Sequence, residues 1–278
     1  SGNYADRTAD DFDNVAAALF DTRFGMDFGR CFDMAIADKW GYYLFDEVGS
    51  TNDVIKDYCG ESDKYVAVVA ESQTLGRGRL GRNWKSPKGN LFFSLAFEYE
   101  LQRAGELAFA ASLSLLQTVK KIAPFADIKL KWPNDVLLNN AKMSGILLEK
   151  GPEKYMIIGI GVNVAASPKI DNAVYKITSL ADVGIKITAL KMLRLFMESF
   201  SQNLSLLQTN GFAVLREKWL ENAKNLGKEI TVRQSGKEEK GIFAGIDENA
   251  ALLLKTPAGT KRILAGDVFF EEMNKKDE

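Results

Sequence analysis

The chain has 278 residues, of which 46% are hydrophobic and 26% charged, so it can bury a full core and form one large domain plus a smaller one. A formal net charge of -1 excludes the basic surface of a general nucleic-acid or membrane binder. The lack of histidine excludes Ser-His-Asp and Cys-His catalysis and histidine-based zinc sites, and two cysteines exclude a cysteine-only metal site. We therefore expect a cytoplasmic protein with reduced thiols, no targeting or spanning segment, and no nucleic-acid or membrane partner.

The first 39 residues are acidic, with eight aspartates against three arginines and one lysine. Within them, "TADDFDNVAAALF" places apolar residues at helical spacing after Thr8, which predicts a docking helix. We treat residues 1–39 as an acidic N-terminal extension.

Residues 40–226 alternate strand and helix patterns and predict an α+β domain with a mixed β-sheet. Several apolar runs, such as "YMIIGIGV", are continuous, as in strands that helices cover on at least one face. The expected strands are 42–48, 65–71, 91–100 and three or four more within 127–164, and the expected helices are 50–59, 104–122, 188–208 and 211–225.

Residues 227–278 have a different texture, with short alternating strands separated by turn residues such as Ser-Gly and Pro-Ala-Gly. About fifty residues of this kind predict a small β-barrel as a separate C-terminal domain.

The stretch "GRGRLGRNWKSPK", residues 76–88, places five cations among glycines with no acidic residue between them. Glycines let backbone amides approach a ligand closely, and arginine forks match phosphate or carboxylate. The pattern is not a dinucleotide fingerprint, since a strand follows it instead of a helix. Taken alone it fits a phosphate-binding loop and a solvated surface loop equally well, whereas an RGG-type RNA segment needs many repeats and a basic surround.

A second group of polar residues lies in "KLKWPNDVLLNNAKMSGILLE", residues 129–149. Lys142 stands just before an apolar strand, where a partly buried ammonium group needs an anionic partner to offset its desolvation. Trp132 fits a core position and a stacking surface, and both interpretations stay open here.

Together, "STN" at 50–52, "GRGRLGR" after Gln73, "KWPND", "KMSG" at 142–145 and "GIGVNV" at 159–164 resemble the biotin protein ligase family in order and spacing. The resemblance implies a catalytic domain of the biotin/lipoate ligase type followed by an SH3-like barrel. It also implies a ligase that uses ATP and Mg²⁺ to make biotinyl-5'-AMP from biotin. The biotinyl group would then pass to a lysine of a biotin carboxyl carrier protein domain.

The same resemblance implies a role for each matching residue. Lys142 would lie between the biotin carboxylate and the α-phosphate, with Arg77 and Arg79 as further catalytic cations. Asp135 would organise the phosphate-bound Mg²⁺. The residues expected to hold the ureido head of biotin are Ser50, Thr51, Asn52 and Gln73, and those expected to wall the biotin ring are Gly145, Gly159 and Gly161. The loop expected to cover the adenylate contains Gly76, Arg77, Gly78, Arg79 and Arg82. The residues expected on the adenine and ribose side are Trp84, Asn134 and Asn163.

Several alternatives and departures remain. A lipoate-type ligase would share the fold and the adenylation chemistry, although "KWPND", "STN" and Gln73 favour biotin. A sensing protein without turnover and a nucleic-acid binder that uses residues 76–88 are rivals from other classes. The acidic N-terminus differs from the basic winged helix of repressor members of the family, so we do not expect transcriptional regulation. Glu271 stands where some members present an arginine, so no C-terminal residue is assigned to the site, and monomer and homodimer are both open.

Overall fold

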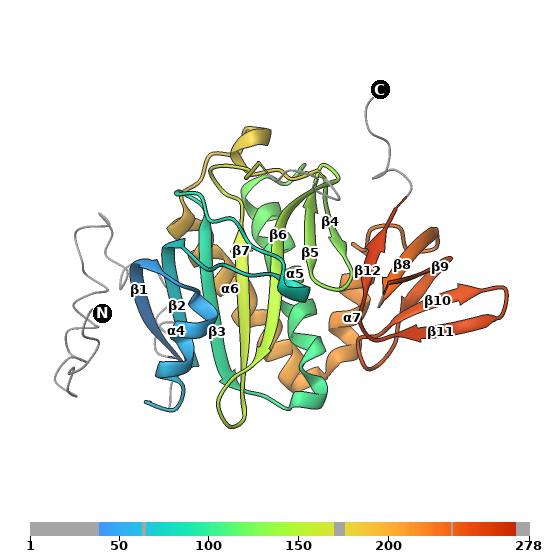
Figure 1. Ribbon diagram of the computed structural model, residues 1–278, viewed down its shortest axis with the longest axis horizontal. Coiled ribbons are helices and arrows are strands. Elements are labelled where there is room, and N and C mark those ends of the chain that lie inside the picture. The colour runs from blue at the N-terminus through green and yellow to red at the C-terminus, as the bar shows by residue number, and fades with distance from the viewer. Residues whose placement is uncertain (1–38, 63–64, 170–175, 235, 271–278) are drawn as a thin grey trace.

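The computed structural model describes residues 39–62, 65–169, 176–234 and 236–270. These residues form a seven-stranded sheet backed by helices and a five-stranded sheet beside it (Figure 1). The docking helix expected within residues 1–39 lies outside the described residues. The domain boundaries at residues 39 and 226 stay predictions.

The seven-stranded sheet is mixed, as predicted. Its strand order is β1-β2-β3-β7-β6-β5-β4; β1 and β2 pair in parallel, and every other neighbouring pair is antiparallel. The strands are β1 (Trp40–Val48), β2 (Tyr65–Gln73), β3 (Leu91–Glu98), β4 (Ile128–Lys131), β5 (Asp135–Leu138), β6 (Ala141–Lys150) and β7 (Tyr155–Val162).

One face of this sheet is covered by α5 (Gly105–Ile122) and α6 (Ala189–Asn210), with α7 (Phe212–Leu220) beside them (Figure 1). Successive residues of β7 point alternately to this helix-covered face and to the opposite face. Ile158 and Ile160 belong to the core that contains these helices, whereas Gly159 and Gly161 face the other side. The apolar run that predicted a covered strand therefore packs one face against these helices, and its other face carries Ile157, buried in a second small cluster, followed by the two glycines.

Local sequence explains where α6 begins and ends. The Thr188 hydroxyl accepts a hydrogen bond from the Lys191 amide, and Gly211 follows the last turn at φ +74°. The predicted helix at 211–225 is shorter than expected and ends at Leu220. The short helix predicted at 50–59 forms as α4 (Thr51–Val54) and the 3₁₀ turn η2 (Ile55–Tyr58), and Ser50 precedes it without a side-chain cap.

The C-terminal strands form an antiparallel sheet in the order β11-β10-β9-β8-β12. The run "KRILAGDVFF" is split into two strands at opposite edges of this sheet, and the described residues show no pairing between those edges that would close a barrel. The strands are β8 (Glu229–Gln234), β9 (Lys237–Ile246), β10 (Leu252–Thr256), β11 (Gly259–Ile263) and β12 (Asp267–Phe269).

Trp132 connects the two sheets. Its side chain is 3% exposed, and its indole Nε1 donates a hydrogen bond of 3.1 Å to the carbonyl oxygen of Ala250, in the turn before β10. Trp132 is therefore a core residue at the contact between the sheets.

Within the described part of the chain, no helix is long and apolar enough to cross a membrane.

The Trp132→Phe variant keeps an aromatic ring but leaves the Ala250 carbonyl without this donor, so we expect it to lose about 1 to 3 kcal/mol of unfolding free energy in denaturant titrations. Trp219→Phe is the matched control, because the Trp219 indole of α7 donates to the Ser112 hydroxyl of α5, away from the contact between the sheets. Both variants should be destabilised, but only Trp132→Phe should speed amide exchange in β10. If the amides of β10 exchanged at the same rate in Trp132→Phe and Trp219→Phe, Trp132 would not couple the two sheets.

Candidate active site

A cavity of about 480 Å³ lies over the face of the seven-stranded sheet opposite α5 and α6, a size typical of small-molecule sites. The loop after β2 crosses in front of β3, β7 and β6 (Figure 1), and several of its residues line the cavity. Of the residues predicted for the site, the cavity is lined by Ser50, Thr51, Asn52, Gln73, Arg77, Gly78, Arg79, Arg82, Trp84, Asn134, Asp135, Lys142, Gly145, Gly159, Gly161 and Asn163. Gly76 does not line it.

Glycines form the floor of the cavity. A Cβ on Gly161 would meet the Trp84 indole at 2.4 Å, and one on Gly159 would meet the Asn52 side-chain oxygen at 2.2 Å. Gly145 lies against the same indole, where an added Cβ would come within 3.0 Å of it. The glycines of "GIGVNV" are therefore needed as space for two neighbouring side chains. Gly76 is structural in the same sense, because a Cβ there would lie 2.7 Å from the Trp84 carbonyl oxygen.

A β-bulge sets the direction of Lys142. Along β5, Asp135 pairs with Gly145 and Val136 with Ser144, but Leu137 pairs with Lys142, so Met143 is the extra residue. Residues 142 and 145 would point to opposite faces of a regular strand. With the bulge, both line the cavity, and Met143 is buried in the core beneath.

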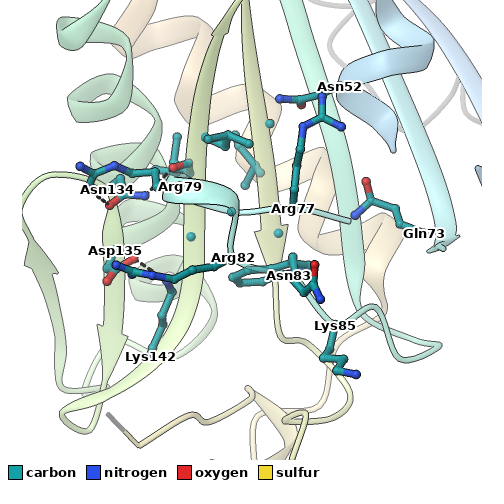
Figure 2. A pocket seen from close by; sticks show the side chains of 18 of the residues that line it. Asn52, Gln73, Arg77, Arg79, Arg82, Asn83, Lys85, Asn134, Asp135 and Lys142 are labelled. Atoms are coloured by element: carbon teal, nitrogen blue, oxygen red, sulfur yellow. Dashed lines mark hydrogen bonds and ion pairs between the residues drawn. The ribbon is translucent and has the colours of Figure 1, made fainter. Parts of the chain in front are cut away.

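One end of the cavity, which we call the polar end, consists of Thr51, Asn52, Gln73 and Arg77 (Figure 2). The Gln73 side-chain oxygen accepts hydrogen bonds from the Thr51 amide at 2.9 Å and the Thr51 hydroxyl at 3.2 Å. This fixes the orientation of the Gln73 amide, whose Nε2 is left as a donor and lies 3.4 Å from the Ser86 hydroxyl.

Ser94 supports this end from below. It is fully buried on β3, and its hydroxyl contacts the Thr51 hydroxyl at 2.7 Å and the Asn52 side-chain oxygen at 2.5 Å. Ser94 was not predicted, although a lone hydroxyl in the apolar strand "LFFSLAF" was a usable signal.

Opposite the polar end lie Arg79, Arg82, Lys142 and the Asp135 carboxylate (Figure 2). Together with Lys131, which pairs with Asp135, and Asp267, which pairs with Arg82, they form what we call the cationic end. Asp135 contacts the Lys142 ammonium at 2.6 Å and the Lys131 ammonium at 3.2 Å. Burial by itself raises the pKa of the Asp135 carboxyl, but the two lysines outweigh it and lower that pKa from 3.8 to about 2. Asp135 is therefore ionised at neutral pH.

The loop arginines reach the C-terminal sheet. Arg79 donates hydrogen bonds of 3.2 Å to the Asn134 side-chain oxygen and the Gly266 carbonyl, and Arg82 forms an ion pair with Asp267. Asp267 also lines the cavity. The C-terminal unit thus contributes a residue that the sequence did not reveal, since nothing in "GDVFFEE" indicates which segment β12 faces.

The loop itself is a tight hairpin. The Gly78 amide donates to the Arg82 carbonyl at 2.6 Å, and the Trp84 amide donates to the Gly76 carbonyl at 2.9 Å. These bonds place Trp84 over the glycine floor, where its ring centroid lies 5.5 Å from the Lys142 ammonium. Lys88 is exposed and lies outside the cavity lining, whereas Lys85 is exposed but contributes to that lining, as do the unpredicted Asn83, Pro168 and Ile177.

The described residues contain no group of three or more His, Cys, Asp or Glu side chains that could hold a metal ion. Both Asp135 oxygens contact lysines, which is a poor environment for a cation held by protein ligands alone. The residues present therefore do not form a metal site of their own.

Comparisons with known proteins agree with this geometry. The biotin/lipoate A/B protein ligase family matches residues 44–163, and the biotin protein ligase C terminal domain matches residues 226–271. The biotin-[acetyl-CoA-carboxylase] ligase of Paracoccus denitrificans is 38% identical over 214 residues, which cover 73% of this chain and 89% of that protein.

Two further comparisons extend this result. The bifunctional ligase/repressor BirA of Bacillus subtilis is 33% identical over 211 residues, which are 72% of this chain but 65% of that protein. The biotin protein ligase from Aquifex aeolicus, solved in complex with biotin and ATP, superposes with a TM-score of 0.73 at 29% identity and covers 82% of this chain and 97% of its own. The chain therefore belongs to the biotin protein ligase family.

Proposed function

We propose that the chain joins biotin to ATP as biotinyl-5'-AMP and then transfers the biotinyl group to a lysine of a biotin carboxyl carrier protein domain. The observation that carries the proposal is the division of one cavity into two ends: a polar end, with amides, a hydroxyl and the carboxylate-paired Arg77, and a cationic end. Among the described residues that line it, five are cationic and two are acidic. Biotin has the matching form, with a neutral ureido ring at one end and a carboxylate at the other.

At the polar end, the fixed amides of Asn52 and Gln73 and the Thr51 hydroxyl suit a ureido group, which has both N–H donors and a carbonyl acceptor. Ser50 is buried beside them. Gly145, Gly159 and Gly161 line the cavity without side chains, as expected for residues that wall the fused rings.

At the cationic end, one biotin carboxylate oxygen attacks the α-phosphorus of ATP. A P–O bond forms to the carboxylate, the bond to the β-phosphate oxygen breaks, and pyrophosphate leaves with the electron pair. The carboxylate is already ionised, so this step needs no general base and is compatible with a chain without histidine. Lys142, Arg79 and Arg82 supply positive charge where negative charge develops.

Trp84, Asn134 and Asn163 are our proposed contacts on the adenine and ribose side. Asn134 is already oriented, because its Nδ2 donates to the Ile146 carbonyl at 2.6 Å while its oxygen accepts from Arg79. The Asn163 side chain donates to the Thr178 carbonyl at 3.1 Å. In the second step, the neutral amine of the carrier lysine attacks the biotinyl carbonyl carbon. A C–N bond forms, the C–O bond to the α-phosphate breaks, AMP leaves with the electron pair, and the nitrogen gives up one proton to water.

We infer that Mg²⁺ arrives on the ATP phosphates, because the part of the chain that the structure describes forms no metal site of its own. A divalent cation there neutralises phosphate charge. The assignment of Asp135 to that cation, a cytoplasmic location, and the absence of nucleic-acid and membrane partners stay predictions.

Biotin and lipoate separate the proposal from its nearest rival. With MgATP, we expect pyrophosphate release with biotin and little with lipoate, because the polar end would leave its amides unpaired against a dithiolane ring. The measurement is a coupled pyrophosphate assay. Release with lipoate but not with biotin would contradict the proposal.

Lys142→Met should lower kcat for pyrophosphate release by about 10²- to 10³-fold, as the loss of one preorganised charge typically does. Lys129→Met is the control, because Lys129 is a half-buried strand lysine that does not line the cavity. Its kcat should stay within about twofold of the parent chain. Equal kcat in both variants would show that Lys142 takes no part in the chemistry. If the protein only binds its ligands, the parent and both variants should all show no turnover.

Asp135→Asn should reduce the unfolding free energy at pH 7 by about 2 to 5 kcal/mol, because two lysines lose their shared carboxylate. The folded-state pKa of Asp135 is about 2, below its usual 3.8, so its stabilisation is present above pH 4 and is lost as the pH falls towards 2. The stability gap between parent and variant should therefore narrow over that range in urea titrations. A gap that is constant from pH 6 to pH 2 would contradict an ionised Asp135; Asp127→Asn, at an exposed site, controls for general acid effects.

A further inference from the structure

Arg77 is held between two carboxylates from separate elements. Its guanidinium donates to both Asp53 oxygens, at 2.6 and 2.7 Å, and to both Glu149 oxygens, at 2.9 and 3.0 Å. Asp53 lies in α4 and Glu149 near the end of β6, so this one side chain connects the loop to both. Such paired, charge-assisted bonds fix direction as well as distance.

Glu149 also orients the polar end. The Asn52 side-chain nitrogen donates to Glu149 at 3.0 Å, while the Asn52 oxygen contacts the Ser94 hydroxyl at 2.5 Å. A flipped Asn52 amide would turn its oxygen towards the carboxylate, so only one orientation satisfies both partners. The same carboxylate therefore sets the orientation of Asn52 and the position of Arg77.

The carboxylates of Asp53 and Glu149 are both charged at neutral pH, because the pKa of each is lowered. The bond to Arg77 lowers the pKa of Asp53 from 3.8 to about 2. Burial raises the pKa of Glu149, but Arg77 and Asn52 outweigh it and the net shift is downward. The charge of Arg77 is thus already matched by two ionised groups, a poor setting for a residue that must bind phosphate.

We propose that Glu149 and Asp53 are positioning residues that fix Arg77 and the first half of the loop, residues 76–78, over the biotin end of the cavity before ATP binds. Arg77 then acts as a wall of the biotin site, and phosphate binding falls to Arg79, Arg82 and Lys142. This inference rests on the proposed function, and it replaces the expectation that Arg77 and Arg79 act alike.

The contacts of the loop separate the two halves physically. Arg77 is bound to β6 and α4, whereas Arg79 contacts Asn134 before β5 and Gly266 of the C-terminal sheet, and Arg82 contacts Asp267 of that sheet. Weakening the Arg77 contacts should therefore make the polar end of the cavity less ordered and leave the contacts of Arg79 and Arg82 in place.

The kinetic test compares Glu149→Gln, Asp53→Asn and Arg77→Lys with the parent in the pyrophosphate assay, with biotin and ATP varied separately. The amide in Glu149→Gln can still accept from Asn52 but loses the charge that holds Arg77, and lysine cannot span both carboxylates. We expect KM for biotin to rise about tenfold in Glu149→Gln and Arg77→Lys and less in Asp53→Asn, with KM for ATP within about twofold. A rise in KM for ATP as large as that for biotin, or no change in either, would overturn the proposal.

Asp57→Asn is the matched control, because Asp57 is an exposed carboxylate in η2, one turn after Asp53. Its two KM values should equal those of the parent. If Glu149→Gln does not fold, Asp53→Asn serves as the second variant, since the Asp53 side chain is 53% exposed.

Amide exchange of the ligand-free chain tests the same inference without any activity. The Gly78 and Trp84 amides close the loop hairpin, so both should exchange faster in Glu149→Gln and Arg77→Lys than in the parent or in Asp57→Asn. Unchanged exchange at these two amides would overturn the positioning role. Because no biotin or ATP is present, this result stands apart from any failure of the proposed function.

Discussion

The bulge at Met143 is the constraint on which the site depends. Strand β6 must pack Met143 and Ile146 against the helices and also present Lys142 and Gly145 to the cavity, and a regular strand cannot do both. The extra residue resolves the conflict by shifting the register against β5. Backbone bonds between Lys142 and the segment around Ile177 hold the bulged stretch from the other side, with Lys142 accepting from the Thr178 amide at 3.0 Å.

The loop over the cavity owes its position to charge. Its arginines meet carboxylates from two different units: Arg77 meets Asp53 and Glu149, and Arg82 meets Asp267. These pairs are partly exposed, so each adds little to stability by itself. Their value lies in direction, since together they place a glycine-rich hairpin and its tryptophan over the floor. The cations of the loop are therefore not equivalent, although the sequence presents them as one series.

Much of this arrangement could be predicted from sequence because it follows from local patterns. Apolar runs located the strands of the large sheet, alternation located those of the C-terminal sheet, and the helix expected at 188–208 forms as α6. The order of "STN", "GRGRLGR", "KWPND" and "GIGVNV" brought the right segments to one cavity. The remaining features arise from tertiary pairing. The bulge depends on how β6 fits between two neighbours, and the roles of Glu149 and Asp267 depend on which strands end near the loop. Ser94 was a local signal that could have been used and was missed.

The central claim is that this cavity activates biotin with ATP for transfer to a carrier lysine. It is tested most directly by the mass of a biotin carboxyl carrier domain after incubation with the chain, biotin and MgATP. The account predicts a gain of one biotinyl group on one lysine, which disappears when ATP is omitted. An unchanged carrier mass under conditions in which a known ligase modifies the same domain would contradict it.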